Sequence, residues 1–159
     1  MSGHRGDSSA VQISPNDLLC EMKPLVRNSM SRGVDISWDL EPALPDILVE
    51  RIQFQRMVLN LTVNANTAMP HGGELLIRTC DQPAHPDRVN MSIGDTGNGM
   101  SADTVEHIFE PFYTTRPSNG GTGLGLAIVH AIVNQFGGEI AVRSELGLGT
   151  TFEIGLPAT

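Results

Sequence analysis

The stretch GGTGLGLAIVH, residues 120–130, alternates glycine with other residues and then continues as an apolar run. Glycine adopts backbone conformations closed to other residues and lets backbone N–H groups come close to a ligand. A helix that begins after such a turn offers its first N–H groups to an anion such as phosphate. The stretch therefore predicts either a mechanical hinge or a phosphate-binding turn in front of a buried helix.

Two common glycine motifs fit this stretch badly. A P-loop carries a lysine directly after its last glycine, and the single lysine of this chain, Lys23, lies far away in the sequence. A dinucleotide-binding fingerprint needs G-x-G-x-x-G directly after a strand. Here the spacing is G-x-G-x-G, at residues 121–125, and it follows a polar loop. A P-loop is excluded, and the dinucleotide fingerprint is a poor match.

Composition limits the class of protein. The chain has 159 residues, of which 40% are hydrophobic and 4% aromatic, so we expect one domain with a mainly aliphatic core. The formal net charge of −8 argues against a nucleic-acid partner and against direct contact with an anionic membrane. Cys20 and Cys80 form no CxxC pattern, which predicts two buried thiols and a reducing, cytoplasmic location. Residues 1–13 lack the apolar core of a signal peptide and are expected to be a flexible lead-in.

Hydrophobic periodicity and turn residues predict an α/β fold, with helices packed on one face of a mixed sheet. Ser14 and Pro15 are typical of a helix start, and Pro24 should kink or split that helix. The last helix is apolar on nearly all sides, so it should be well buried. The expected order is a helix at 14–30, strands at 34–40 and 47–49, a helix at 50–68, strands at 74–80 and 88–95, a short helix at 101–108, a long loop at 109–122, a helix at 123–136 and a strand pair at 137–145 and 149–157.

A second glycine cluster, DTGNGM, follows the predicted strand at 88–95. The carboxylate of Asp95 would stand where strand becomes loop, and a carboxylate can accept a hydrogen bond from an exocyclic amine such as that of adenine. Gly97 and Gly99 would let a flat base come close. The alternative is a simple Asx-turn between strand and helix, a common use of the DTG sequence.

A polar row follows the predicted helix at 50–68. Asn60 and Asn64 are four residues apart and so share one helix face. An asparagine oxygen is a hard, neutral ligand that suits Mg²⁺. The alternative is a solvated helix face, where asparagine is tolerated without being favoured. The apolar stripe of the same helix comprises Phe54, Met57, Val58, Leu61, Ala65 and Ala68.

Taken together, the motifs resemble the catalytic and ATP-binding domain of histidine kinases, within the group of gyrase, Hsp90, histidine kinase and MutL ATPases. The resemblance covers about residues 14–157, and the variants NANTAMPHGG, FEPFYTT and GTGLGLAIV are similar to the hybrid and nitrogen-regulation types. It implies a two-layer α/β sandwich of the Bergerat type, a mixed sheet of about five strands backed by three helices. The N, G1, F, G2 and G3 boxes correspond, in order, to Asn60–Ala68, Asp95–Met100, Ile108–Thr115, Gly121–Ala127 and Gly147–Phe152.

The resemblance also implies a role for single residues. Asp95 would accept a hydrogen bond from the adenine amino group, with Thr150 supporting the adenine side. Asn64 would bind Mg²⁺, and Asn60 would lie near the phosphates. Further nucleotide-binding positions of the first glycine box are Gly97, Gly99 and Met100.

The segment before the last helix resembles an ATP lid. Phe109 and Phe112 would anchor the lid, and Arg116 would help to neutralise phosphate charge. Gly121, Gly123 and Gly125 would form the lid hinge and phosphate cradle. Further nucleotide-binding positions in this segment are Thr115, Thr122 and Leu124.

The function implied is binding of Mg-ATP and transfer of the γ-phosphoryl group to a histidine of a dimerisation domain, and from there to a response-regulator receiver domain. The isolated domain is expected to be a monomer, because the dimerisation helices lie elsewhere. None of the histidines (His4, His71, His85, His107 and His130) lies in a helix of that kind, and none is expected to bind metal.

Two departures from the family pattern open alternatives. Asn60 stands where ATP-hydrolysing relatives have a glutamate base, so rapid ATP hydrolysis and a serine acceptor are both disfavoured. Asn66 and Thr67 stand where many relatives have a basic residue. The second departure keeps open a docking module that binds no nucleotide.

Overall fold

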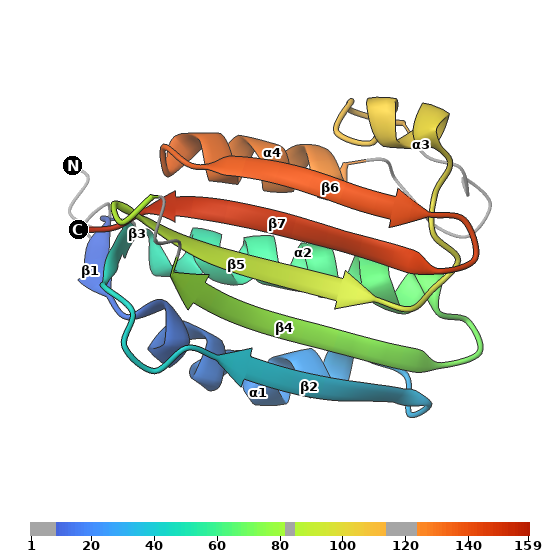
Figure 1. Cartoon of the computed structure of the whole chain (residues 1–159), viewed down its shortest axis with the longest axis horizontal. Coiled ribbons are helices and arrows are strands. Elements are labelled where there is room, and N and C mark those ends of the chain that lie inside the picture. The colour runs from blue at the N-terminus through green and yellow to red at the C-terminus, as the bar shows by residue number, and fades with distance from the viewer. Residues whose placement is uncertain (1–8, 82–84, 114–123) are drawn as a thin grey trace, which may run out of the picture.

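The computed structural model describes residues 9–81, 85–113 and 124–159. Its main sheet has five strands in the order β2-β4-β5-β7-β6, as Figure 1 shows. β2 and β4 are parallel and the other neighbours are antiparallel, so the sheet is mixed as predicted. The strands are β2 Val34–Leu40, β4 Gly73–Asp81, β5 Arg88–Asp95, β6 Glu139–Glu145 and β7 Gly149–Pro157.

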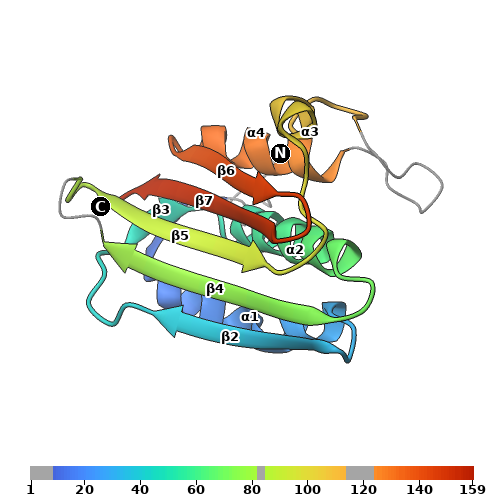
Figure 2. The same cartoon turned by 45° about the vertical axis from the view of Figure 1, so that its right-hand side comes forward.

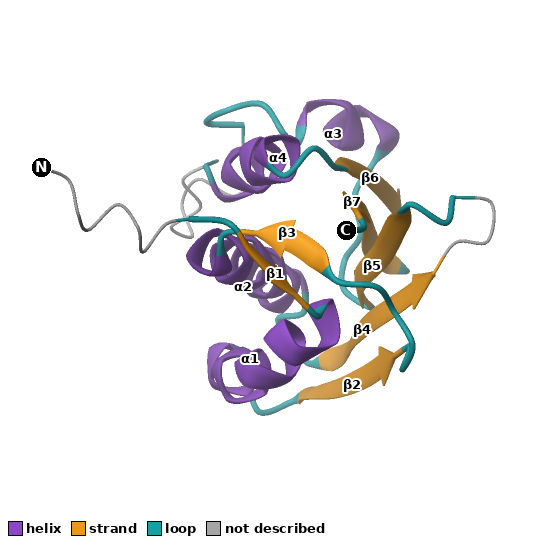
Figure 3. Ribbon diagram, turned by 90° about the vertical axis from the view of Figure 1, so that its left-hand side faces the viewer, coloured by secondary structure: helices purple, strands orange, loops and turns teal. Residues whose placement is uncertain are grey.

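Three long helices form a second layer on one face of this sheet, which Figure 3 shows edge-on. They are α1 Pro15–Ser29, α2 Arg51–Ala68 and α4 Gly125–Gln135. The short helix α3, Ala102–His107, lies beside β6 at the edge of the sheet. This is the predicted two-layer α/β sandwich of five strands and three helices. Among the described residues, no helix combines the length and apolar character that a membrane crossing requires.

The core lies between the two layers, because alternate residues of the central strands point toward the helices. Four residues of β5 are buried on that face and end with Asp95, while the intervening residues are only half-buried. β7 follows the same alternation and begins it with Thr150. Phe54 and Phe152 are the large aromatic residues among many buried aliphatic ones, so the prediction of a mainly aliphatic core is confirmed.

A small second sheet was not predicted. β1, Val11–Ile13, pairs antiparallel with β3, Ile47–Val49. The expectation of a flexible lead-in is therefore wrong for residues 11–13. A strand of three residues is too short to show the alternation that identifies strands in a sequence.

Three local predictions also need correction. Pro24 does not split α1. Because proline has no N–H, the carbonyl of Cys20, four residues earlier, loses its helical hydrogen bond. Both residues lie on the exposed side of α1, so this carbonyl can bond to water instead. Neither thiol is fully buried, because Cys20 is exposed and Cys80 is half-buried. α4 is not buried all round: His130 and Asn134 are among its exposed residues.

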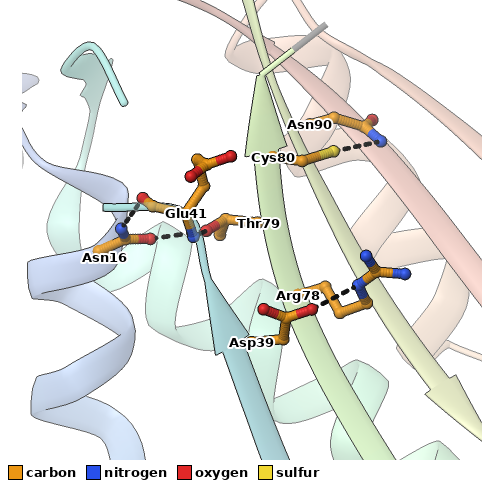
Figure 4. Close-up of polar contacts among 7 residues, drawn as sticks. All are labelled: Asn16, Asp39, Glu41, Arg78, Thr79, Cys80 and Asn90. Carbon is orange, nitrogen blue, oxygen red and sulfur yellow. Dashed lines mark hydrogen bonds and ion pairs between the residues drawn. The ribbon is translucent and has the colours of Figure 1, made fainter. Parts of the chain in front are cut away.

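Hydrogen bonds among polar side chains and backbone groups link α1 to the sheet, as Figure 4 shows. The Thr79 hydroxyl donates a hydrogen bond to Asn16 Oδ1 at 2.8 Å and accepts one from the Glu41 backbone N–H at 3.0 Å. Asn16 Nδ2 then donates to the Glu41 carbonyl at 2.6 Å. Thr79 is only 4% exposed and Asn16 is half-buried, so removing the hydroxyl would leave Asn16 Oδ1 without its partner in a place of limited water access.

We expect Thr79→Val to lower the free energy of unfolding by about 1–3 kcal/mol, because it keeps the shape and leaves buried polar groups unpaired. Urea unfolding measures this loss. The matched control is Thr151→Val on the helix-free face of β7, where the hydroxyl makes no hydrogen bond with the described residues. The control should change stability by less than about 0.5 kcal/mol; equal losses in the two variants would show that the Thr79 network adds nothing.

Candidate functional site

The site is built around the carboxylate of Asp95, at the end of β5. Asp95 is 9% exposed, and its Oδ1 accepts a hydrogen bond from the Gly97 N–H at 2.8 Å. Burial raises the pKa of this carboxyl above its ordinary value, while hydrogen bonds from the backbone of Gly97 and Thr150 act in the opposite direction. The result is a buried, acceptor-rich group held in place by backbone, suited to recognise a ligand donor.

Asp95 belongs to a row of three polar side chains that crosses three strands. Asp95 is the register partner of Thr150 on β7, and Thr150 is the partner of Ser144 on β6. Partners of this kind point to the same face with Cβ atoms about 5 Å apart. Two residues along each strand, on the same face, the corresponding residues are Ile93, Phe152 and Val142. The polar row therefore lies at the edge of the apolar core. An open hollow of about 360 Å³ at this end is lined by all three members of the row and by neighbouring residues of the β6–β7 hairpin.

The glycine cluster DTGNGM, residues 95–100, lies between the end of α2 and the β6–β7 turn. The Asn98 N–H donates to the Ala68 carbonyl at 2.9 Å, and the Gly147 N–H donates to the Asn98 carbonyl at 2.7 Å. These two bonds bring motifs distant in the sequence to one end of the sheet.

Gly97 and Gly99 are required by the protein's own packing. A Cβ added at Gly97 would stand 2.3 Å from the Ala68 carbonyl oxygen, and one added at Gly99 only 1.9 Å from that of Glu145. Gly99 also has φ +70°, which other residues rarely adopt. Contact of either glycine with a base stays a prediction.

Asn60 and Asn64 lie on α2 and are both half-buried. The Asn60 Nδ2 atom is buried and has no hydrogen-bond partner among the described residues. An unpaired buried donor is costly and calls for an explanation, such as a ligand oxygen. Asn66, in contrast, accepts a hydrogen bond from the Ser31 N–H at 2.8 Å, so its side chain joins α2 to the α1–β2 turn.

α2 and α4 lie side by side and run in opposite directions, which Figures 1 and 2 both show. At one end, Gln135 Nε2 donates to the Glu50 carboxylate at 2.6 Å. The beginning of α4 therefore lies toward the C-terminal half of α2, which carries the two asparagines. At Gly125 an added Cβ would meet none of the described residues within 4 Å.

The two phenylalanines of the predicted lid anchor differ. The Phe109 ring stacks on His130 of α4 with 5.2 Å between centroids, and its edge contacts Phe152 at 6.4 Å. Phe112 is 74% exposed, with φ +67°. Phe109 is therefore packed into the fold, whereas Phe112 makes no comparable contact within the described residues. That either residue anchors a lid stays a prediction.

Of the other predicted positions, Met100 and Leu124 lie within the described residues and the rest do not. Met100 is brought to the row, because its N–H donates to the Ser144 hydroxyl at 2.7 Å. Leu124 directly precedes α4 and its carbonyl accepts from the Ile128 N–H at 2.9 Å. Outside the described residues lie Thr115, Arg116, Gly121, Thr122 and Gly123.

Sequence analysis missed two residues of this region. Ser144 was passed over because a single serine in a strand carries no signal, and only the register shows that it joins the row. His130 carries no motif signal either, and only the fold brings its ring to Phe109.

His107 lies with Asp103 and Glu106 in a group whose ligand atoms are within 4.8 Å of one another, a feature that the sequence analysis did not anticipate. Its Nδ1 already pairs with Glu110, which raises the pKa of the imidazole. The two carboxylates are exposed to solvent, as such groups often are without binding a metal.

Comparison with known proteins identifies the family. Residues 49–159 match the family described as histidine kinase-, DNA gyrase B-, and HSP90-like ATPase. The chain belongs to this family. Its similarity is to the catalytic ATP-binding domain of sensor histidine kinases, as the resemblance implied.

Two curated relatives are sensor kinases. The chain is 39% identical to the sensor kinase CckA of Brucella abortus, over 89% of this chain and 16% of the relative. It is 37% identical to the sensor histidine kinase ZraS of Escherichia coli, over 91% of this chain and 30% of the relative. The chain thus spans less than a third of the length of these proteins.

Solved structures agree. ShkA, in complex with AMPPNP, matches with a TM-score of 0.78 and 31% identity, over 95% of this chain and 31% of ShkA. The mycobacterial sensor histidine kinase MprB matches with a TM-score of 0.80 and 26% identity, over 94% of this chain and 97% of MprB. Both similarities cover nearly all of the two-layer sandwich.

Proposed function

We propose that this domain binds Mg-ATP at the Asp95 row and delivers the γ-phosphoryl group to a histidine on a dimerisation domain. The single observation that carries the proposal is the buried Asp95 carboxylate at the end of β5, held by the Gly97 N–H and lining an open hollow. Membership of the ATPase family and the likeness to a structure in complex with an ATP analogue support it.

The residues fit ATP and Mg²⁺ by their chemistry. Asp95 accepts hydrogen bonds and can take one from the adenine amino group. Asn60 Nδ2 can donate to a phosphate oxygen, and the N–H groups at the start of α4 favour negative charge. Bound Mg²⁺ would neutralise phosphate charge, with Asn64 as its protein ligand.

The chemical step is phosphoryl transfer, in which positioning and charge stabilisation do most of the work. An acceptor imidazole nitrogen would form a bond to the γ-phosphorus as the bond to the β–γ bridging oxygen breaks, and ADP would leave. Asn60 cannot act as a base for water at neutral pH, which favours transfer to a protein over hydrolysis. The same position disfavours the serine-acceptor relatives, which use a glutamate there.

The wider assignment follows from the sensor-kinase relatives. We propose that the phosphoryl group passes from the acceptor histidine to a receiver domain, that the domain works in the cytoplasm, and that it is a monomer by itself. The hybrid or nitrogen-regulation subtype stays a prediction. The test is to join the chain to a histidine-containing dimerisation domain and to follow transfer from γ-labelled ATP. Acid-labile, alkali-stable label on the acceptor is expected; no label with a nucleotide-binding chain would contradict the transfer.

Asn64→Ala should raise the Kd for ATP about tenfold or more when Mg²⁺ is present. A tenfold change corresponds to about 1.4 kcal/mol of binding free energy. With EDTA in place of Mg²⁺, the variant and the parent should bind alike. Calorimetric titration measures both conditions. The matched control is Asn66→Ala on the same helix, which removes the bond to Ser31 and should leave Mg²⁺ dependence unchanged. An equal loss in both conditions for Asn64→Ala would assign Asn64 to packing instead.

The second candidate is a docking module that binds no nucleotide. It is favoured by the absence of a basic residue at positions 66 and 67. The commitment of Asn66 to Ser31 weakens this alternative, because position 66 serves the fold rather than the phosphates. A folded chain that binds no ATP would favour the docking module.

A further inference from the structure

The Phe109 ring bridges α4 and β7. Its face stacks on the His130 imidazole of α4, with 5.2 Å between ring centroids and 29° between ring planes. It contacts the Phe152 ring of β7 edge-on, at 6.4 Å and 64°. Phe152 is 2% exposed and lies two residues after Thr150, a member of the polar row. Phe109 therefore connects α4 to a strand that carries part of this row.

The two contacts of Phe109 differ in how firmly they are held. Phe152 belongs to the dense core, whose side chains have little freedom to move. His130 lies on the exposed side of α4, and within the described residues the one hydrogen-bonding contact of its ring joins Nδ1 to Asn134 Nδ2, at 3.4 Å. Histidine is also a weaker helix former than alanine. Neither burial nor helix propensity accounts for His130, which leaves its stacking on Phe109 as its distinct contribution.

This bridge joins the elements that carry the two ends of the proposed nucleotide site. At the adenine end, Asp95 is held by the Gly97 backbone and by strand register. The proposed phosphate end is the start of α4, where the helix begins at Gly125. His130 lies about 7.5 Å farther along this helix, at a rise of about 1.5 Å per residue. The geometry of the site then depends on the spacing between helix and sheet, and Phe109 contacts both.

We propose that His130 is a positioning residue of the nucleotide site, whose ring holds Phe109 against Phe152 and so fixes the start of α4 relative to Asp95. A ligand held at both ends needs them at a set spacing, and a loosened bridge must be ordered on binding at a cost in affinity. The inference rests on the proposed function. It adds a residue that acts through Phe109 rather than by touching the nucleotide.

The test measures the Kd for ATP in the presence of Mg²⁺, by calorimetry, on samples shown to be folded by circular dichroism. His130→Ala removes the stacked ring and should raise this Kd about three- to tenfold, the range expected from the loss of one aromatic pair. His130→Phe keeps a ring on Phe109 and should restore the parent's Kd. The matched control is Asn134→Ala, on the same exposed side of α4, which removes the 3.4 Å contact and leaves the stack. It should leave the Kd unchanged.

A second background shows whether His130 acts through Phe109. Phe109→Leu keeps an apolar side chain and removes the ring, so it should raise the Kd by itself. Adding His130→Ala to it should raise the Kd no further, since no ring is left to stack on. An equal effect of His130→Ala in both backgrounds would overturn the inference.

The remaining outcomes separate the inference from the proposed function. If His130→Ala lowers the urea midpoint but binds ATP with the parent's Kd, His130 serves stability alone and the inference is wrong, while the nucleotide site stands. If Asn134→Ala or His130→Phe weakens binding as much as His130→Ala does, the stacked ring is not the cause, which also overturns it. A folded parent that binds no ATP would overturn both the inference and the proposed function.

Discussion

Asp95→Asn should abolish the thermal stabilisation of this domain by ATP without unfolding it. Asparagine has the same shape, but its amide nitrogen would face the adenine amino group, donor against donor. We expect ATP affinity to fall by about a hundredfold or more, which corresponds to about 2.7 kcal/mol. Thermal unfolding with and without ATP measures binding and stability together, because a ligand at a hundred times its Kd stabilises by about 2.7 kcal/mol.

The stability of Asp95→Asn should also depend on pH differently from that of the parent. Burial raises the pKa of Asp95, so the folded state holds its proton more tightly than the unfolded state does. The free energy of unfolding of the parent therefore falls as pH rises from the unfolded-state pKa through the folded-state one. Asparagine does not titrate, so the stability of Asp95→Asn relative to the parent should rise over this interval and level off above it.

The matched control for this experiment is Asp103→Asn, which removes the same charge from the exposed side of α3. It should leave stabilisation by ATP unchanged. If ATP stabilises Asp95→Asn as much as the parent, Asp95 is not the adenine acceptor.

Gly149→Ala should destabilise the fold by about 3 kcal/mol or more, the upper range for overpacking of a dense region. Gly149 has φ +129°, and an added Cβ would lie 2.0 Å from the Asp95 carbonyl oxygen. That oxygen belongs to the paired backbone of β5, so it cannot move away without breaking the polar row. Urea unfolding measures the loss.

Gly147→Ala separates the steric cost from the backbone cost. Gly147 also has a positive φ, +81°, but an added Cβ there would meet nothing within 4 Å. Its substitution should cost only about 1–2 kcal/mol of backbone strain. Similar losses for the two variants would show that close approach at Gly149 contributes nothing to the fold.

Motifs named Asp95, Asn60 and Asn64 as candidates, but not every residue that the fold places beside them. Asp95 and the asparagines stood out only in combination with the glycine motifs, because each has a common structural use by itself, an Asx-turn or a solvated helix face. The two-layer fold followed from the order of the predicted strands and helices along the chain and from the apolar residues of α2. The polar row could not be predicted in the same way, because the pairing of Asp95, Thr150 and Ser144 depends on strand register between distant segments.

The wrong predictions share a cause. Val11–Ile13 forms a strand only because β3 offers a partner. Pro24 is tolerated because it falls on the exposed side of α1. Each outcome is decided by tertiary context, which local sequence patterns do not contain.

The most direct test of the central claim is a calorimetric titration of ATP into the unmodified chain, with and without Mg²⁺, in a sample shown to be folded by circular dichroism. The account predicts saturable binding of one ATP per chain, weaker when EDTA replaces Mg²⁺. A folded chain that gives no binding heat and no thermal shift at millimolar ATP would contradict it, and would leave the glycine clusters as elements of packing alone.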